Sequence, residues 1–154
     1  MRRRRTKRFP REAASVALAR TWLAEQLAQL IPAPLDDLLD DAVLGLSELA
    51  TNAVEHGAGQ YFRVACTVNN ERLTIETLDG GRSRPLPAVR GLPATTNENG
   101  RGLVIVDHIS GGDWECDARP AGLMRVRFHL KLVGHIDPRH SPPAPPAAAR
   151  HGRY

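Results

Sequence analysis

The sequence predicts one domain of the α/β class, in which helices pack against a sheet. Two patterns support this fold class. Residues 35–56 repeat apolar side chains at helical spacing, and residues 61–77 alternate apolar with polar side chains, as strands do. A length of 154 residues, with 42% hydrophobic and 25% charged residues, fits a single globular core.

Two helices are expected before the first clear strand. Residues 13–31 place apolar side chains at helical spacing, and Pro32 and Pro34 close the segment. The second helix, residues 35–56, has a longer apolar stripe and ends at Gly57. Residues 102–109 predict a shorter third helix, entered through two glycines and stopped by Gly111-Gly112.

The strands follow from alternation. Residues 61–77 predict a β-hairpin that turns at Asn69-Asn70, and residues 114–119 and 123–132 predict two further strands. Because side chains alternate, Asp79 falls on the same face as Leu73, Ile75 and Thr77. A carboxylate is therefore directed toward the buried side where this strand ends.

The chain divides into three expected segments. Residues 1–8 are expected to be a basic disordered arm, residues 9–133 the folded domain, and residues 134–154 a Pro/Ala-rich disordered tail. Residues 80–99, rich in Gly, Pro, Arg and Asn, predict a mobile lid.

The net charge of +4 comes from the arm. Residues 1–11 carry seven basic and no acidic side chains, whereas the rest has 14 basic and 17 acidic residues, about −3. Clustered arginine can contact nucleic acid or anionic lipid. Since no recognised DNA-binding motif accompanies the arm, we expect a solvated terminus and no direct binding of nucleic acid.

Other classes are disfavoured. No apolar run approaches the roughly 20 residues of a membrane helix, and no signal sequence follows the basic start, so a cytoplasmic protein without membrane contact is expected. Cys66 and Cys116 lie far apart without a CxxC pattern, which favours small core residues over a zinc site.

A candidate site begins with Glu48 and Asn52. At spacing i, i+4 they project from one side of a helix, about 40° apart, beside the apolar stripe. A carboxylate next to an amide oxygen suits Mg²⁺-phosphate chemistry, although such a pair by itself is more commonly a solvated helix face and proves nothing. Gly100-Arg101-Gly102 before a helix offers free N–H groups suited to phosphate, although it is also an ordinary glycine turn.

Taken in order, three segments resemble the N, G1 and G2 boxes of the GHKL (Bergerat-fold) ATPase superfamily. They are the run from Glu48 through Asn52 to Gly57, then Asp79-Gly80-Gly81, then Gly100-Arg101-Gly102-Leu103. The chain is most similar to the anti-sigma-factor serine/threonine kinases. The resemblance implies an α+β two-layer sandwich of the histidine-kinase ATPase type, whose mixed, mostly antiparallel sheet is covered by helices on one face.

The resemblance also implies roles for individual residues. Asn52 would hold Mg²⁺, Glu48 would be the general base, and Asp79 would accept a hydrogen bond from the adenine amino group of ATP. Gly81 would let the adenine ring approach. The phosphates would be bound by Gly100, Arg101, Gly102 and Leu103.

The implied function is a regulatory kinase of transcription. It would sequester a sigma factor and transfer the γ-phosphate of ATP to a serine of an antagonist (anti-anti-sigma) protein, with homodimerisation through the first strand or helix. A non-catalytic ATP-dependent binding module of the same fold is the alternative. Two departures are Arg82 to Pro85, where the family continues with a second glycine, and the arginine arm, which is a poor candidate for the family's first edge strand.

Overall fold

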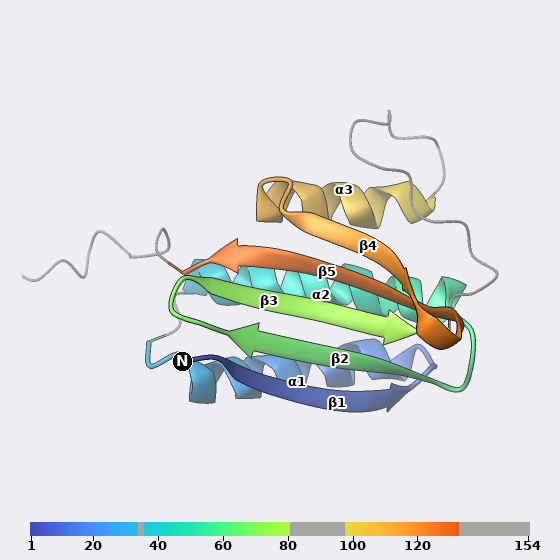
Figure 1. The fold of residues 1–154 in the computed structure, drawn as a ribbon, viewed down its shortest axis with the longest axis horizontal. Helices are drawn as coiled ribbons and strands as arrows, with labels where there is room; N and C mark the ends of the chain where they lie inside the picture. Colours follow the sequence, from blue (N-terminus) through green and yellow to red (C-terminus); the bar gives the residue numbers. More distant parts are fainter. Residues whose placement is uncertain (34–35, 81–97, 133–154) are drawn as a thin grey trace, which may run out of the picture.

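A five-stranded sheet organises the computed structural model, which describes residues 1–33, 36–80 and 98–132 (Figure 1). Its strands are β1 (Arg3–Pro10), β2 (Tyr61–Val68), β3 (Arg72–Asp79), β4 (Trp114–Arg119) and β5 (Leu123–Lys131). Their spatial order is β1-β2-β3-β5-β4, and every neighbouring pair is antiparallel. The predicted hairpin and the two later strands are confirmed, and a short 3-10 turn, Pro120–Gly122, joins β4 to β5.

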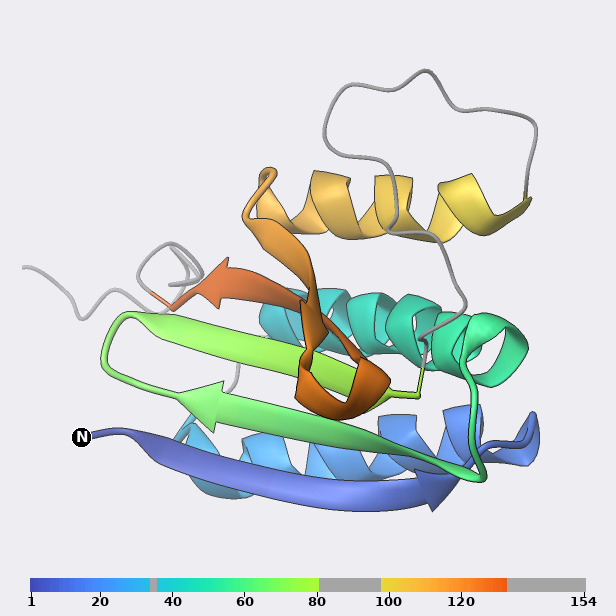
Figure 2. The same ribbon diagram turned by 45° about the vertical axis from the view of Figure 1, so that its right-hand side comes forward.

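The described helices are α1 (Ala14–Leu30), α2 (Asp36–His56) and α3 (Glu98–Ser110), and they cover one face of the sheet. Figure 2 shows α2 lying between α1 and α3. The first two helices agree with the predicted segments. In α1 the backbone turns extended at Ile31, whose N–H still donates to the Leu27 carbonyl. The expected α+β two-layer sandwich is confirmed.

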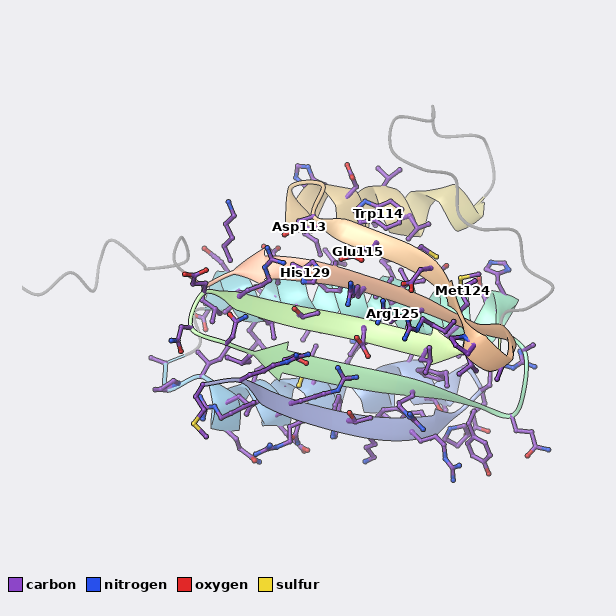
Figure 3. The ribbon with its side chains drawn as sticks, in the orientation of Figure 1. Asp113, Trp114, Glu115, Met124, Arg125 and His129 are labelled. Carbon is purple, nitrogen blue, oxygen red and sulfur yellow. The ribbon has the colours of Figure 1, made fainter. Side chains whose placement is uncertain are left out.

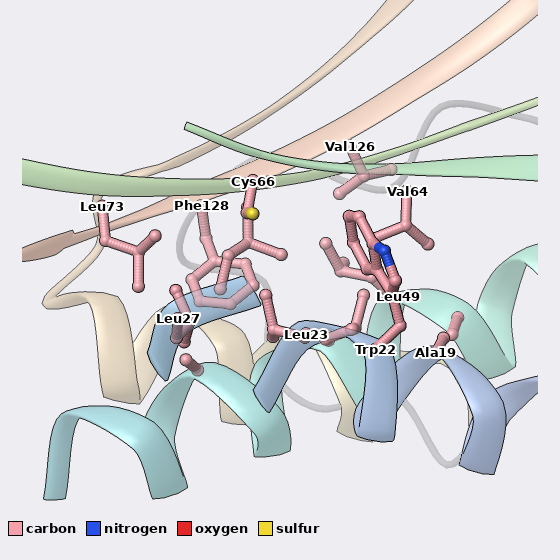
Figure 4. Close-up of a cluster of buried hydrophobic side chains, with 14 of the residues drawn as sticks. Ala19, Trp22, Leu23, Leu27, Leu49, Val64, Cys66, Leu73, Val126 and Phe128 are labelled. Atoms are coloured by element: carbon pink, nitrogen blue, oxygen red, sulfur yellow. The ribbon is translucent and has the colours of Figure 1, made fainter. Parts of the chain in front are cut away.

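The core lies between the sheet and the helices (Figure 4). Leu73, Cys66 and Phe128 point from the sheet toward Leu23 and Leu27 of α1. Each such side chain contributes roughly 1.5–3 kcal/mol when it is fully removed from water. Burial raises the pKa of the Cys66 thiol to about 11, so this group stays protonated and behaves as the small core residue that was expected.

The prediction of a disordered arm at residues 1–8 is wrong, because β1 begins at Arg3. It pairs with β2 along its whole length, from Arg3 opposite Val68 to Pro10 opposite Tyr61. The apolar end of the strand fixes it: Phe9 is buried, stacks on Phe62 at 5.8 Å between ring centroids, and meets Trp22 edge-on at 6.1 Å. Burial and ladder hydrogen bonds outweigh the low strand propensity of arginine.

The third helix begins earlier than predicted, at Glu98 instead of Gly102. Gly100 and Gly102 suggested a helix entry because glycine is a poor helix former, but here they lie inside α3. Most of the expected lid, residues 81–97, and the expected tail, residues 134–154, lie outside the described residues.

Candidate functional site

Helix α2 holds Glu48 and Asn52 along the border of the core. Leu49 and Ala53, the residues that follow them in sequence, are fully buried, whereas Glu48 and Asn52 are only partly buried. This difference arises because the apolar stripe turns toward the sheet and the two polar side chains stand beside it. One side of α2 therefore presents a carboxylate and an amide that are accessible in part.

The backbone of α3 lies directly on the Glu48 side chain. A Cβ placed at Gly102 would come within 2.7 Å of Glu48 Oε2 and 3.5 Å of Glu48 Cβ. Real Cβ atoms essentially never approach an atom that closely, so a side chain here would displace the carboxylate. The structure thus brings together two predicted site residues that are distant in sequence, Glu48 and Gly102.

A second glycine allows this close approach. Gly45 lies one turn before Glu48, and a Cβ there would meet Phe128 Cζ of β5 at 2.3 Å and Ile109 Cδ1 of α3 at 2.8 Å. Helix α2 is therefore tightly packed against β5 and the end of α3 one turn before Glu48. Together with the Gly102 contact, this packing holds α3 close to α2.

At the other end of α2, Gly57 lies on the side chain of Asp79. A Cβ at Gly57 would come within 3.1 Å of the Asp79 carboxyl carbon, and the Gly80 N–H donates to the Ala58 carbonyl at 3.2 Å. Asp79 is 3% exposed and ends β3 on the helix-facing side, as the alternation predicts. The end of α2 and the end of β3 are thus joined around a buried carboxylate.

These contacts place the predicted site residues at two levels of α2. From Glu48 to the end of the helix at His56 the rise is about 12 Å, at 1.5 Å per residue, with Asn52 between them. Glu48 marks the end where α3 begins, and Asp79 marks the end where β3 stops. An elongated ligand with an anionic end and a hydrogen-bonding base suits this arrangement.

The glycine-rich segment occupies the beginning of α3. Gly100 lies in the first turn, where backbone N–H groups have no partner within the helix and form the positive end of its dipole. Arg101 belongs to the same turn, and Leu103 packs partly buried against the core. Gly81 lies outside the described residues, so its predicted contact with adenine stays a prediction.

The electrostatic environment of Glu48 favours its neutral form. Burial raises the pKa of the Glu48 carboxyl above its ordinary value, and the nearby negative charge of Glu55 raises it further. Carboxylates that act as proton acceptors are commonly adjusted in this direction, toward the working pH. The environment therefore suits a base that accepts and releases a proton.

Three contributors to this site were absent from the sequence-based prediction. Gly45 and Gly57 act through the space their missing side chains leave, and Glu55 acts through its charge on Glu48. Gly57 was included in the run that resembles the N box and was interpreted as the end of a helix, without a site role of its own. The spacing Glu48, Asn52, Glu55 was a usable signal, since these residues occupy one helical face.

The donor set fits MgATP better than a metal held by protein alone. Within the described residues, no three His, Cys, Asp or Glu side chains gather as a metal-binding group. Asn52 offers an amide oxygen and Glu48 a carboxylate, while Mg²⁺ in such sites takes further oxygens from phosphate and water. The missing side chains of Gly57 and Gly102 leave room for Asp79 and Glu48 themselves, which lie close to the backbone at these two glycines.

A helix-covered antiparallel sheet with this site along α2 defines a nucleotide-binding domain of the GHKL ATPase type. The family model of the histidine kinase-like ATPase domain matches residues 9–126, so the chain belongs to that family. ATP binding is the function that this membership carries. A comparison with curated proteins gives no significant match. None of the described helices has the length and apolar character required to span a membrane.

Proposed function

We propose that this domain is a serine/threonine protein kinase that transfers the γ-phosphoryl group of ATP to a serine of an antagonist protein and sequesters a sigma factor. The observation that carries the catalytic part is Glu48: a partly buried carboxylate of raised pKa, one helical turn from Asn52 and in contact with α3. A pure binding module has no need of a base in that position. Support for the two partner proteins comes from the sequence resemblance.

Asn52 and Asp79 would bind the substrate. ATP, together with Mg²⁺, supplies the phosphoryl group. Asn52 directs its amide oxygen to the metal, the start of α3 directs N–H groups to the phosphates, and Asp79 accepts a hydrogen bond from the adenine amino group. Asp79 is 3% exposed, so a hydrogen bond from the adenine amino group would be made away from bulk water.

Glu48 would activate the attacking group. It takes the proton of the serine hydroxyl while the bond between serine Oγ and the γ-phosphorus forms. The bond between that phosphorus and the bridging oxygen breaks, and ADP leaves with its electron pair. Because catalysis of this kind depends on positioning, the Gly102 backbone against Glu48 would fix the direction of the base.

The alternative is a non-catalytic module in which ATP sets the affinity for a partner protein. Both functions need Asn52 and Asp79, so binding alone does not separate them. Glu48 does, since only transfer requires a proton acceptor.

The test combines binding with transfer. Calorimetry with MgATP should show binding by the wild type, and Asn52→Ala and Asp79→Asn should each weaken it by at least about tenfold. With radiolabelled ATP and protein extract of the source organism, the wild type should label serine on another protein. Glu48→Gln should keep the MgATP affinity and lose this labelling.

Two results would contradict the proposal. Labelling that survives Glu48→Gln excludes Glu48 as the base. MgATP binding without labelled serine leaves the non-catalytic module. In either case the calorimetry of Asn52→Ala and Asp79→Asn still tests the binding site by itself.

A further inference from the structure

The sheet face opposite the helices carries charged side chains in rows across the strands (Figure 3). No described helix covers this face. One row runs through Glu76, Arg127 and Glu115 on β3, β5 and β4; the next runs through Arg125 and Asp117. The strand register therefore places opposite charges side by side on the half of this face that is formed by β3, β5 and β4.

On the half formed by β3, β5 and β4, cations and carboxylates compensate one another. Arg125 donates twice to Asp117 at 3.0 Å, and Arg127 donates to Glu115 at 2.7 Å. His129 lies 2.8 Å from the Thr74 hydroxyl and 3.4 Å from Glu115 Oε1. This half of the face is electrostatically balanced within the domain.

The half formed by β1 and β2 is different. Arg8 lies directly opposite Arg63 in the register, and both side chains are exposed. Like charges directly opposite one another destabilise a strand pair. Within the part of the chain that the structure describes, neither arginine has a carboxylate within ion-pair distance. The fold thus tolerates a local repulsion that an anionic ligand would relieve.

Two further exposed cations of the outer strand lie on the other side of β1. Arg5 and Lys7 share the side that carries buried Phe9, and Lys7 Nζ lies 5.4 Å from the centroid of the Phe9 ring. On the open face we call Arg8 and Arg63 the basic edge. Other cations of β1 are already engaged, since Arg3 donates to the Leu30 carbonyl and Arg4 pairs with Glu76.

An aromatic ring adjoins the basic edge. The Arg8 guanidinium lies 4.3 Å from the centroid of the Tyr61 ring, and Tyr61 is 46% exposed. An exposed ring beside clustered arginines on an open sheet is the combination that single-stranded nucleic acid uses, with phosphates on the cations and a base stacked on the ring. The strand holds these groups in place, unlike the solvated arm that the sequence predicts.

We propose that the basic edge and Tyr61 bind single-stranded nucleic acid, in addition to the nucleotide site on the helix-covered side. Both cations of the basic edge are arginines, whose planar guanidinium matches phosphate oxygens in pairs. A second copy of the chain is a poor occupant of this edge, because pairing β1 with β1 would set cations against cations. An acidic polypeptide shares the charge but makes no use of the Tyr61 ring.

The test measures binding of a labelled single-stranded oligonucleotide of about 15 nucleotides by fluorescence anisotropy at roughly 50 to 200 mM salt. The full chain should bind, with an affinity that falls as salt rises. Each phosphate contact with a single strand contributes about 0.7 to the steepness of log affinity against log salt. Loss of two contacts in Arg8→Gln with Arg63→Gln should therefore make this slope shallower by about 1.4. Tyr61→Ala should weaken binding at least about fivefold with an unchanged slope.

A charge-matched control separates the site from net charge. Arg20→Gln with Arg119→Gln also removes two exposed cations, on α1 and at the end of β4. This pair should leave the salt slope unchanged. All variants should keep MgATP binding and the circular dichroism of the wild type, because the basic edge lies away from the contacts of Glu48 and Asp79.

Three outcomes would overturn the proposal. They are no oligonucleotide binding by the wild type, equal loss in the charge-matched control, or polyglutamate binding that is as tight and equally sensitive to Arg8→Gln with Arg63→Gln. The last outcome would identify an acidic polypeptide as the occupant. None of them bears on the proposed kinase activity, which the calorimetry tests separately.

Discussion

The backbone of Gly102 lies against the carboxylate of Glu48, so that a Cβ at position 102 would come within 2.7 Å of Glu48 Oε2. This contact joins two segments that lie 54 residues apart in sequence. It makes the position of the proposed base depend on the absence of a side chain in another helix. Several consequences for stability and activity can therefore be separated by substitution.

Gly102→Ala should impair phosphate transfer without unfolding the domain. The new methyl group displaces the Glu48 carboxylate, and a misplacement of about 1 Å can cost a hundredfold in rate. Stability should change little, because alanine favours a helix over glycine by about 1 kcal/mol and the atom it meets is the end of a flexible side chain. Thermal unfolding and the transfer rate, measured on the same preparation, check both parts.

Val104→Ala is the control for this substitution. Val104 is 52% exposed on the same helix, so its truncation should leave transfer unchanged. A Gly102→Ala protein as active as the wild type would show that the position of Glu48 does not limit the reaction.

Glu48→Gln should stabilise the domain at neutral pH. Since the folded state raises the pKa of Glu48, the folded protein holds this proton more tightly than the unfolded chain does. Stability therefore falls as pH rises from the ordinary value of 4.5 through the raised pKa, and the full loss persists at neutral pH. Urea unfolding across this range should show a smaller fall in the free energy of unfolding for the glutamine variant.

Glu55→Gln is the companion variant. It removes the smaller of the two causes, the negative charge near Glu48, and leaves the burial of Glu48 in place. It should recover only part of the stability that Glu48→Gln recovers. Identical pH profiles for the wild type and Glu48→Gln would contradict the assigned electrostatic environment.

Much of the fold could be predicted because the spacing of apolar side chains along a helix or strand indicates which of its sides is buried. Alternation placed Asp79 on the buried face of its strand, and helical spacing put Glu48 and Asn52 on one side of α2; the structure agrees on both. The family resemblance supplied the connection between these residues, which local patterns do not contain. Their chemical roles stay predictions.

The remainder depended on contacts between distant segments. The arginines of β1 predict a solvated arm when propensity alone is considered, yet burial of Phe9 against Phe62 fixes the strand. Gly102 was interpreted as a helix entry, whereas the structure uses its missing side chain to admit Glu48. The sequence shows the same residue type in both cases. Only the neighbouring structural element distinguishes a glycine that starts a helix from one that admits a close contact.

Gly57→Ala should lower both stability and nucleotide affinity. The added Cβ would lie 2.3 Å from the Ala53 carbonyl oxygen, a backbone atom that cannot move alone, and 3.1 Å from the Asp79 carboxyl carbon. Overpacking of this kind costs about 1–3 kcal/mol, and the shift of Asp79 should weaken MgATP binding as well. Denaturant unfolding and calorimetry measure the two effects.

Gly59→Ala is the control that introduces backbone strain without a new contact at Asp79. Gly59 has a φ of +86° and open space around it, so alanine there should destabilise by about 1 kcal/mol through backbone strain while leaving MgATP affinity unchanged. If Gly57→Ala also left the affinity unchanged, Asp79 would not be positioned through this glycine.

Glu115→Gln should reduce the acid sensitivity of the sheet. The hydrogen bond from Arg127 holds the pKa of Glu115 below its ordinary value, with a smaller contribution from His129. The ion pair therefore adds stability above the unfolded pKa of 4.5, and this stability is lost as pH falls through the lower folded pKa. Because the Glu115 side chain is 46% exposed, solvent screening limits the contribution to about 1 kcal/mol or less. Urea unfolding at neutral pH and below pH 4.5 should show a smaller acid-induced loss of unfolding free energy for Glu115→Gln than for the wild type. The control Glu25→Gln, on the exposed side of α1, should match the wild type. Equal profiles for all three proteins would show that the pair with Arg127 contributes nothing to stability.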